Sequence, residues 1–346
     1  MQEFQVNKTF GIAAPDPVRV SGFAAPGPLT PQIDPQYTFR RNLLSDLLGW
    51  HRGIQSGSIH DGLWLTGPMG SGKSSLIVQT AARLNLNLVE VNGKRRLEIA
   101  DWVGHLTAVG SDVLFQDGPL TTAVRHGAWF LINEADLIDP GELAGLNTLL
   151  DGGPLILPEN GGEVVFPAPG FGLIGTANTV GLGDGSGLYA GVQRLNAAFL
   201  DRFWVVQVDY LTGEEEFVLV KRRVPQIRDE LLRGMIQVAA EVRALFQGEG
   251  ESTAPLDMTF SSRTLIRWAY LTVQYAGDKN PLMRTLQRAL TNRVEPEAAE
   301  AIEGMARRIF GVSSPATGED APNAAGTMAA RRRSVLTGFS PRVSRI

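Results

Sequence analysis

The chain has 346 residues, is 43% hydrophobic and 20% charged, and carries a net charge of −4 at pH 7. Because it contains no cysteine, disulfides, thiolate metal sites and cysteine nucleophiles are excluded. The small negative charge provides no general attraction to nucleic acid or to an anionic membrane.

No apolar run reaches the roughly 20 residues that span a bilayer. The first residues, Met1-Gln2-Glu3-Phe4, lack the basic start and the apolar stretch of a signal peptide. We therefore expect a cytoplasmic protein without membrane contact. Residues 1–36 are expected to form an extended N-terminal arm, since residues 10–35 are rich in proline, alanine and glycine.

A core domain is predicted over residues 37–210. It opens with a helix near Tyr37, indicated by apolar residues at helical spacing: Leu43, Leu44, Leu47, Leu48 and Trp50. Short apolar runs then alternate with helical segments, and these runs are 63–66, 88–91, 129–132, 171–176 and 204–208. Such alternation is typical of βαβ units, so the fold class is α/β, with a parallel five-stranded sheet between two layers of helices.

Three further segments complete the predicted organisation. A β-hairpin is expected at about residues 153–168, because two apolar runs flank a turn centred on Asn160-Gly161. Residues 211–311 keep helical spacing throughout and predict a separate helical domain. Residues 312–346 are expected to be a disordered basic tail, although contact of this tail with nucleic acid or an acidic partner stays open.

One segment, Gly67-Pro68-Met69-Gly70-Ser71-Gly72-Lys73-Ser74, follows an apolar strand and opens a helix. This context supports a phosphate-binding loop, in which glycines let backbone N–H groups surround phosphates at a helix N-terminus. We predict that Lys73 contacts the β- and γ-phosphates of ATP and that the Ser74 hydroxyl binds Mg²⁺. We also expect Ser75 to contribute to ATP binding. A glycine-rich turn with a lysine by chance is the alternative.

Two polar residues end the apolar strand 129–132. Glu134 is predicted to orient and polarise the water that attacks ATP. Asn133 occupies the position where an aspartate usually helps to hold Mg²⁺, so it would act through a metal-bound water and without negative charge. The alternative is a solvated strand end with no catalytic role.

Three more residues are candidates for contact with the nucleotide. Asn178 ends the next strand and is placed to reach the γ-phosphate or the attacking water, although asparagine is also common turn chemistry. Arg202 is placed to reach a nucleotide on a neighbouring subunit, and an ion pair with Asp201 is the equal alternative. Arg263 lies in the first turn of a helix capped by Ser261 or Ser262, where the helix dipole disfavours a cation. An arginine at this unfavourable position indicates a functional role, in which it would reach the nucleotide from the helical domain.

Together these elements resemble an AAA+ ATPase. Gly118-Pro119-Leu120 and the hairpin that follows are similar to the MoxR branch of that class. A closer resemblance, over roughly residues 30 to 275, is to the CobS family, the ATPase subunits of aerobic cobaltochelatases. The segments that carry this resemblance are 33–37, 91–92, 176–184, 187–191, Asn196 with 201–203, and 262–269.

The resemblance implies a ring, a hexamer, with ATP at the subunit interfaces and the helical domain as a lid. It implies the following roles: Lys73 and Ser74 for ATP and Mg²⁺, Glu134 as the catalytic carboxylate, Asn178 as first sensor, Arg202 as a finger acting in trans and Arg263 as second sensor. Relatives typically act on a partner with a von Willebrand factor A domain. Asn133 departs from the family pattern, and the tail has no counterpart.

Three functional hypotheses follow. The first is an ATP-hydrolysing ring that remodels or activates a protein partner, in a metal-chelatase-type complex among others. The second is a slowly hydrolysing, ATP-dependent switch or assembly ring, and Asn133 motivates it. The third is a nucleic-acid motor, which only the basic tail suggests.

Overall fold

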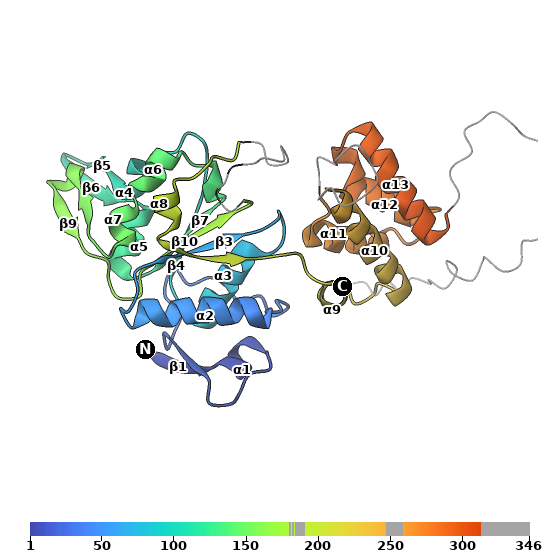
Figure 1. Cartoon of the computed structure of the whole chain (residues 1–346), viewed down its shortest axis with the longest axis horizontal. Coiled ribbons are helices and arrows are strands. Elements are labelled where there is room, and N and C mark those ends of the chain that lie inside the picture. Colours follow the sequence, from blue (N-terminus) through green and yellow to red (C-terminus); the bar gives the residue numbers. More distant parts are fainter. Residues whose placement is uncertain (180, 182, 184–190, 247–258, 313–346) are drawn as a thin grey trace, which may run out of the picture. The chain divides into compact units, whose positions relative to one another are not determined.

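The structure, a computed structural model, describes residues 1–179, 181, 183, 191–246 and 259–312. Most of the predicted basic tail and the family-like residues 180, 182, 184 and 187–190 lie outside this part. The chain divides into two compact units, Met1–Tyr210 and Leu211–Ile346 (Figure 1). This division falls where the sequence changes from alternating strands and helices to helices alone.

The first unit is built on a five-stranded parallel sheet, as predicted. Its strands are ordered β11-β3-β10-β7-β4, and every neighbouring pair is parallel. Their bounds are Phe203–Gln207 (β11), Gly62–Thr66 (β3), Gly172–Ala177 (β10), Trp129–Asn133 (β7) and Leu88–Asn92 (β4). The three central strands are buried along their whole length, which explains their continuous apolar runs.

Helices cover both faces of this sheet (Figure 1). Side chains of a strand point alternately to its two faces, so Leu63 and Leu65 of β3 join one core cluster and Trp64 joins the other. The first cluster packs under α2 (Arg41–Gln55) and α3 (Lys73–Arg83). The second packs under α5 (Pro119–His126), α6 (Pro140–Ala144), α7 (Asn147–Leu150) and α8 (Ala197–Leu200).

The extended arm predicted over residues 1–36 is wrong for the first 22 residues. Strands β1 (Gln2–Gln5) and β2 (Arg19–Gly22) pair in antiparallel fashion and flank the short helix α1 (Val6–Phe10). The apolar side chains Val6, Phe10 and Val20 are buried in the same core cluster as α2. Hydrophobic burial therefore outweighs the proline and glycine content, whereas residues 23–40 contain neither helix nor strand.

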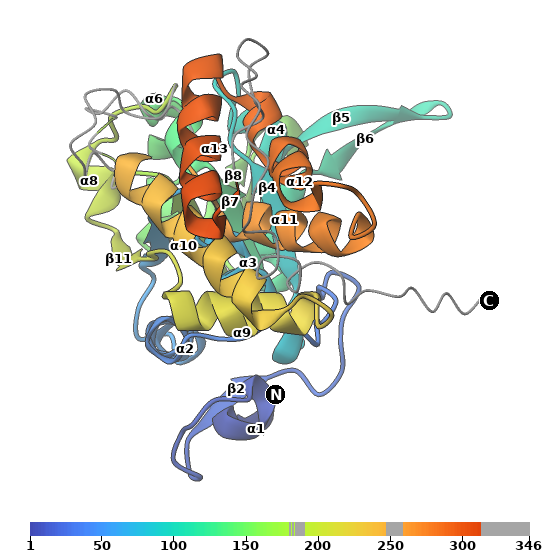
Figure 2. The same ribbon diagram turned by 90° about the vertical axis from the view of Figure 1, so that its right-hand side faces the viewer.

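Two hairpins extend the first unit. Strands β8 (Leu155–Leu157) and β9 (Glu163–Val165) form the expected insert, but its turn is longer than Asn-Gly, because a 3₁₀ turn over Pro158–Asn160 precedes two glycines with positive φ. A second hairpin, β5 (Gly104–Val109) and β6 (Asp112–Asp117), was not expected from the sequence. It extends away from the sheet beyond α4 (Ala100–Val103), as Figure 2 shows. Four of its apolar side chains are exposed: Leu106, Val109, Val113 and Leu114.

The second unit is helical. Its helices are α9 (Gly213–Arg223), α10 (Asp229–Phe246), α11 (Ser262–Gln274), α12 (Pro281–Ala289) and α13 (Pro296–Phe310), with a 3₁₀ turn at Thr291–Arg293. They share one hydrophobic cluster around the fully buried Trp268 and Phe260. Over the described residues, no helix combines the length and the hydropathy that crossing a bilayer requires.

Buried His51 on α2 lies between strand β2 of the N-terminal segment and Trp129 of the central sheet. Its ring is inaccessible to solvent, lies edge-on to Trp129, and places Nε2 2.9 Å from the carbonyl oxygen of Ser21 on β2. Burial lowers the pKa of His51, and the contact with Ser21 acts in the opposite direction. Protonation therefore favours the unfolded chain, so stability is lost as pH falls below the unfolded histidine value of about 6.5.

We predict that His51→Gln reduces the acid sensitivity of the first unit. The fall in its melting temperature between pH 7.5 and pH 5.5, followed by circular dichroism, is expected to be smaller in this variant than in the wild type. His105→Gln is the matched control, since His105 is exposed and should leave the pH profile unchanged. Equal acid sensitivity of all three proteins would contradict the prediction.

Candidate active site

The loop Gly67–Ser74 joins β3 to α3 and closes around the N-terminus of that helix. Gly67, Gly70 and Gly72 have φ values of 144°, 78° and 98°, which side chains disfavour. A Cβ on Gly67 would lie 2.2 Å from the carbonyl oxygen of Val208, so glycine is required there by space as well. The loop thus gathers backbone groups at a helix N-terminus, an arrangement suited to an anion.

Lys73 lies beneath this loop and is only 8% exposed. Its Nζ donates to the carbonyl oxygens of Gly67 (2.6 Å) and Pro68 (3.0 Å) and to Oδ1 of Asn178 (3.1 Å). Burial lowers the pKa of Lys73 to about 8, while the charges of Asp136 and Glu134 act in the opposite direction. The ammonium is therefore held at the loop, against Asn178 from the next strand of the sheet.

A second contact joins Ser74 on α3 to Asn133 at the end of β7. The Ser74 hydroxyl donates to Oδ1 of Asn133, and Thr176 of β10 donates to the same oxygen at 3.4 Å. The amide nitrogen of Asn133 donates to Oε1 of Glu90 on β4 at 2.6 Å. The two residues predicted to serve the metal, Ser74 and Asn133, are thus brought together, and Glu90 joins them without having been predicted.

Glu134, the residue after β7, has an unusual backbone conformation. Its φ of 52° and ψ of 43° lie in the left-handed region, at a cost of about 1 kcal/mol for a residue with a side chain. Its carbonyl oxygen approaches Gly93 so closely that a Cβ there would lie 2.3 Å away. Glu134 is exposed, whereas Asn133, Ala135 and Asp136 around it are buried. The turn therefore presents one carboxylate to solvent at the tip of the sheet.

Asp136 was missed in the sequence, although it lies only two residues after Glu134. It is fully buried, and its Oδ2 accepts from the backbone N–H groups of Asn178 (2.9 Å) and Thr179 (3.2 Å). Burial raises the pKa of Asp136, and these N–H donors act in the opposite direction. Asp136 ties the end of β10 to the turn after β7, which keeps Asn178 beside Lys73.

Arg202 lies between the end of α8 and the start of β11, in a different set of contacts. Its Nε and Nη2 donate to the two carboxylate oxygens of Asp151 at 2.7 and 3.0 Å, and Nη1 donates to the carbonyl oxygen of Ala198 at 2.6 Å. Its partner is thus Asp151, not the neighbouring Asp201. Asp151 raises the pKa of Arg202, and Arg202 lowers that of Asp151. Over the described residues, the hydrogen bonds of the Arg202 side chain go to Asp151 and Ala198 and not to Asn178 beside Lys73.

Arg263 belongs to the second unit, where it is exposed in the first turn of α11. Ser261 is the N-cap, since its hydroxyl accepts from the backbone N–H of Thr264 at 3.2 Å. Ser262 instead donates to Oε1 of Glu216 on α9 at 2.8 Å. Of the two serines considered as caps from the sequence, Ser261 therefore caps α11 and Ser262 connects it to α9.

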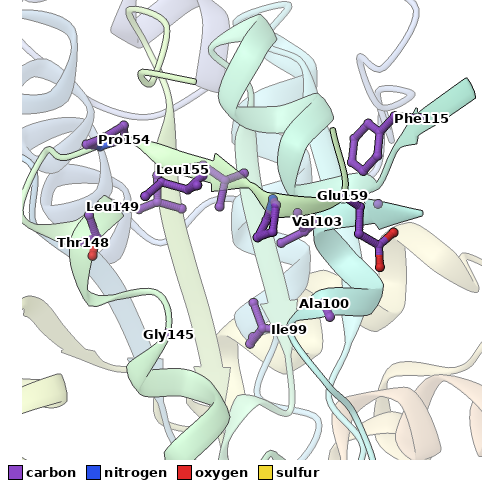
Figure 3. Close-up of a pocket in the computed structure, with 13 residues that line it drawn as sticks. Ile99, Ala100, Val103, Phe115, Gly145, Thr148, Leu149, Pro154, Leu155 and Glu159 are labelled. Atoms are coloured by element: carbon purple, nitrogen blue, oxygen red, sulfur yellow. The ribbon is translucent and has the colours of Figure 1, made fainter. Parts of the chain in front are cut away.

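A cavity of about 440 Å³ lies away from these residues, between α4, α7 and the two hairpins (Figure 3). Apolar side chains from each of these elements line it, among them Val103, Phe115, Leu149 and Leu155. None of the predicted site residues contributes to it. This cavity is therefore separate from the predicted site.

Comparison with known proteins matches residues 62–203 to the AAA domain of the dynein-related subfamily and residues 215–309 to the CbbQ/NirQ/NorQ C-terminal domain. The aerobic cobaltochelatase subunit CobS of a Sinorhizobium species is 33% identical over 274 residues, which cover 76% of this chain and 78% of that protein. The chain belongs to the MoxR-type AAA+ ATPases. The predicted resemblance to CobS is thereby confirmed.

Two other similar proteins are more distant. NorQ of Paracoccus denitrificans is 28% identical over 247 residues, covering 71% of this AAA+ chain and 86% of NorQ. RuvB of Thermotoga maritima, a Holliday junction branch migration motor of known structure, has a TM-score of 0.45 and 15% identity over 75% of this chain and 72% of its own.

In the helical unit of this AAA+ protein, a buried ion pair supports the start of α11. Arg243 on α10 donates to both carboxylate oxygens of Glu216 at 2.6 and 3.0 Å and to the carbonyl oxygen of Phe260 at 2.6 Å. Both side chains are almost fully buried. With Ser262 also bound to Glu216, one charged cluster joins α9, α10 and the turn that precedes Arg263.

We predict that Arg243→Met destabilises the helical unit by about 3–5 kcal/mol, because it leaves the Glu216 carboxylate buried without its partner. Arg233→Met is the control, since the exposed pair Arg233–Glu214 is worth at most about 1 kcal/mol. Urea unfolding followed by circular dichroism at a helix-sensitive wavelength measures both. Similar losses in the two variants would contradict the role given to the buried pair.

Proposed function

We propose that this AAA+ protein binds ATP with Mg²⁺ at the loop Gly67–Ser74 and hydrolyses it. The observation that carries this proposal is the convergence of Lys73 and Asn178 under the loop, with Ser74 and Asn133 in contact beside them. The buried hydroxyl of Ser71 has no partner in the described structure and offers a further donor to a phosphate. Family membership supports nucleotide binding and ATPase activity in general.

The residues present fit both groups. The backbone of residues 67–74 and the side chain of Lys73 would hold the phosphates, with Ser75 following in the first turn of α3. Ser74 would be a direct ligand of Mg²⁺, and Asn133 would bind it through water. Bound there, Mg²⁺ offsets the negative charge of the phosphates. The present hydrogen bond from Ser74 to Asn133 would then be replaced by the bonds of these two residues to the ion and its water.

Two side chains would act on the attacking water. Glu134 is exposed at the end of β7 and would orient and polarise it. Asn178 would contact the γ-phosphate or the same water, and its amide is held in place by Asp136 through the backbone. The left-handed backbone of Glu134 turns the chain at the end of β7 and leaves the carboxylate exposed. This exposure, which the proposed role requires, offers a reason for the strain.

We assign the two arginines to a composite site in a ring of subunits, a hexamer. Arg202 pairs with Asp151 at a partly exposed position, where such a pair contributes little and can be exchanged for phosphate on a neighbouring subunit. Arg263, on the well-anchored start of α11, would be supplied by the helical unit acting as a lid. Arg202 would then stabilise the charge that develops during hydrolysis.

The proposed work of this ring is to remodel or activate a protein partner. CobS is a subunit of an aerobic cobaltochelatase by its name, so a chelatase-type complex and a partner with a von Willebrand factor A domain are the first to consider. A slowly hydrolysing switch is the second candidate function. The neutral Asn133 favours it, since charge beside the metal promotes hydrolysis.

The proposal predicts Mg²⁺-dependent ATP hydrolysis that depends on named groups. Glu134→Gln is expected to lower turnover by at least about 100-fold while ATP still binds, since it removes the carboxylate that acts on water. Lys73→Ala is expected to abolish nucleotide binding. Phosphate release and calorimetric titration measure the two effects. Wild-type turnover in either variant would overturn the proposed function, whereas binding with very slow turnover in the wild type would favour the switch.

A second prediction concerns pH. The Lys73 ammonium must be charged to bind phosphate, and in the nucleotide-free protein its pKa is lowered to about 8. The affinity for ADP is therefore expected to fall as pH rises above 8, by up to about tenfold per pH unit. Lys73→Arg stays charged and is expected to lose this dependence. Calorimetric titration between pH 7 and pH 10 tests both, and a flat wild-type profile would contradict the prediction.

A further inference from the structure

Glu90 is a charged residue between two valines of an edge strand. It lies in the middle of β4, in the sequence Leu88-Val89-Glu90-Val91-Asn92, and is exposed to solvent. In the register of β4 with β7 it lies opposite Leu131, two residues before Asn133 on the same face. Its side chain extends forward to Asn133, with 2.6 Å between Oε1 and Nδ2.

This contact determines which way the Asn133 amide faces. An ionised carboxylate only accepts hydrogen bonds, so Glu90 takes the amide nitrogen. The amide oxygen is then left for the two hydroxyl groups on its other side, Ser74 and Thr176. Ser74 is the residue proposed to bind Mg²⁺, so the oxygen of Asn133 is turned toward the metal position.

We propose that Glu90 is a positioning residue of the Mg²⁺ site that also supplies the negative charge which Asn133 lacks. This inference rests on the proposed binding of ATP with Mg²⁺ at the loop. The Glu90 carboxylate is hydrogen-bonded to the Asn133 amide, whose oxygen faces Ser74. Together the two residues would supply the oxygen acceptor and the negative charge that a single aspartate supplies at the end of β7. The other carboxylates near the loop have their own roles, with Glu134 exposed at the tip and Asp136 bound to Asn178 and Thr179.

The contact between Glu90 and Asn133 affects what is expected when the usual aspartate is restored at position 133. Asn133→Asp alone would place two carboxylates where a 2.6 Å hydrogen bond now lies, and like charges at that distance repel. The single change is therefore expected to weaken the site. Combined with Glu90→Gln, the same change restores one charge and one donor–acceptor pair with the positions exchanged.

The test measures binding of a non-hydrolysable ATP analogue by calorimetry, in EDTA and at increasing Mg²⁺. Glu90→Gln keeps an acceptor for Asn133 but removes the charge. It is expected to raise the Mg²⁺ concentration for half-maximal effect by about tenfold, as for other residues that support metal ligands. The affinity in EDTA is expected to stay within about twofold, because Glu90 does not contact the phosphates. The control Glu98→Gln removes an exposed acid outside the site and should change neither value.

The double variant Glu90→Gln with Asn133→Asp is expected to return the Mg²⁺ requirement to within about threefold of the wild type. Three outcomes would overturn the role of Glu90: an unchanged Mg²⁺ requirement in Glu90→Gln, an equal loss of affinity in EDTA, or failure of the double variant to recover. A wild type that binds no nucleotide in either condition would instead overturn the proposed function, and the role of Glu90 with it.

Discussion

The parallel pairing of β3, β10 and β7 is the constraint on which the candidate site depends. Thr66 lies opposite Ala177, and Gly175 lies opposite Ile132, so the three strands end at one edge of the sheet. The residues that follow each end are then neighbours, although they are about 40 to 110 residues apart in the chain. A slip in the register would separate Lys73, Asn178 and Asn133 at once.

Burial gives these polar residues their particular partners. Lys73 and Asp136 are both removed from water, and each is compensated by backbone groups of the chain around it. A buried charge without such partners costs several kcal/mol, so the contacts that hold the ammonium and the carboxylate also hold the loop and the strand end. Rigidity of the site and satisfaction of its charges therefore have the same physical origin.

The helical unit uses the same principle. Glu216 and Arg243 are paired away from solvent, and the backbone of Phe260 and the hydroxyl of Ser262 complete the cluster. Three segments of the unit meet there, so the first turn of α11 has little freedom to move. An exposed arginine on a rigid support suits contact with a ligand from outside, because little side-chain and backbone order must be created on binding.

The sequence by itself determined the local features of this protein. The loop motif, the five apolar runs, the hairpin at 155–165 and the helical second half all follow from short-range patterns of residue type. These depend on neighbouring residues alone, which is why they are visible without coordinates. The expectation of an extended arm over residues 1–36 failed for residues 1–22, because Val6, Phe10 and Val20 are stabilised by burial against α2, a contact that no local pattern contains.

Only the tertiary structure decided the partners of the charged groups. Glu90 with Asn133, Asp136 with Asn178, Arg202 with Asp151 and Glu216 with Arg243 are each separated by 27 to 51 residues in the chain. A hydrogen bond acts over about 3 Å, whereas sequence patterns carry no information on which distant strand or helix comes that close. The chemistry of the loop was therefore predictable, and the charges that tune it were not.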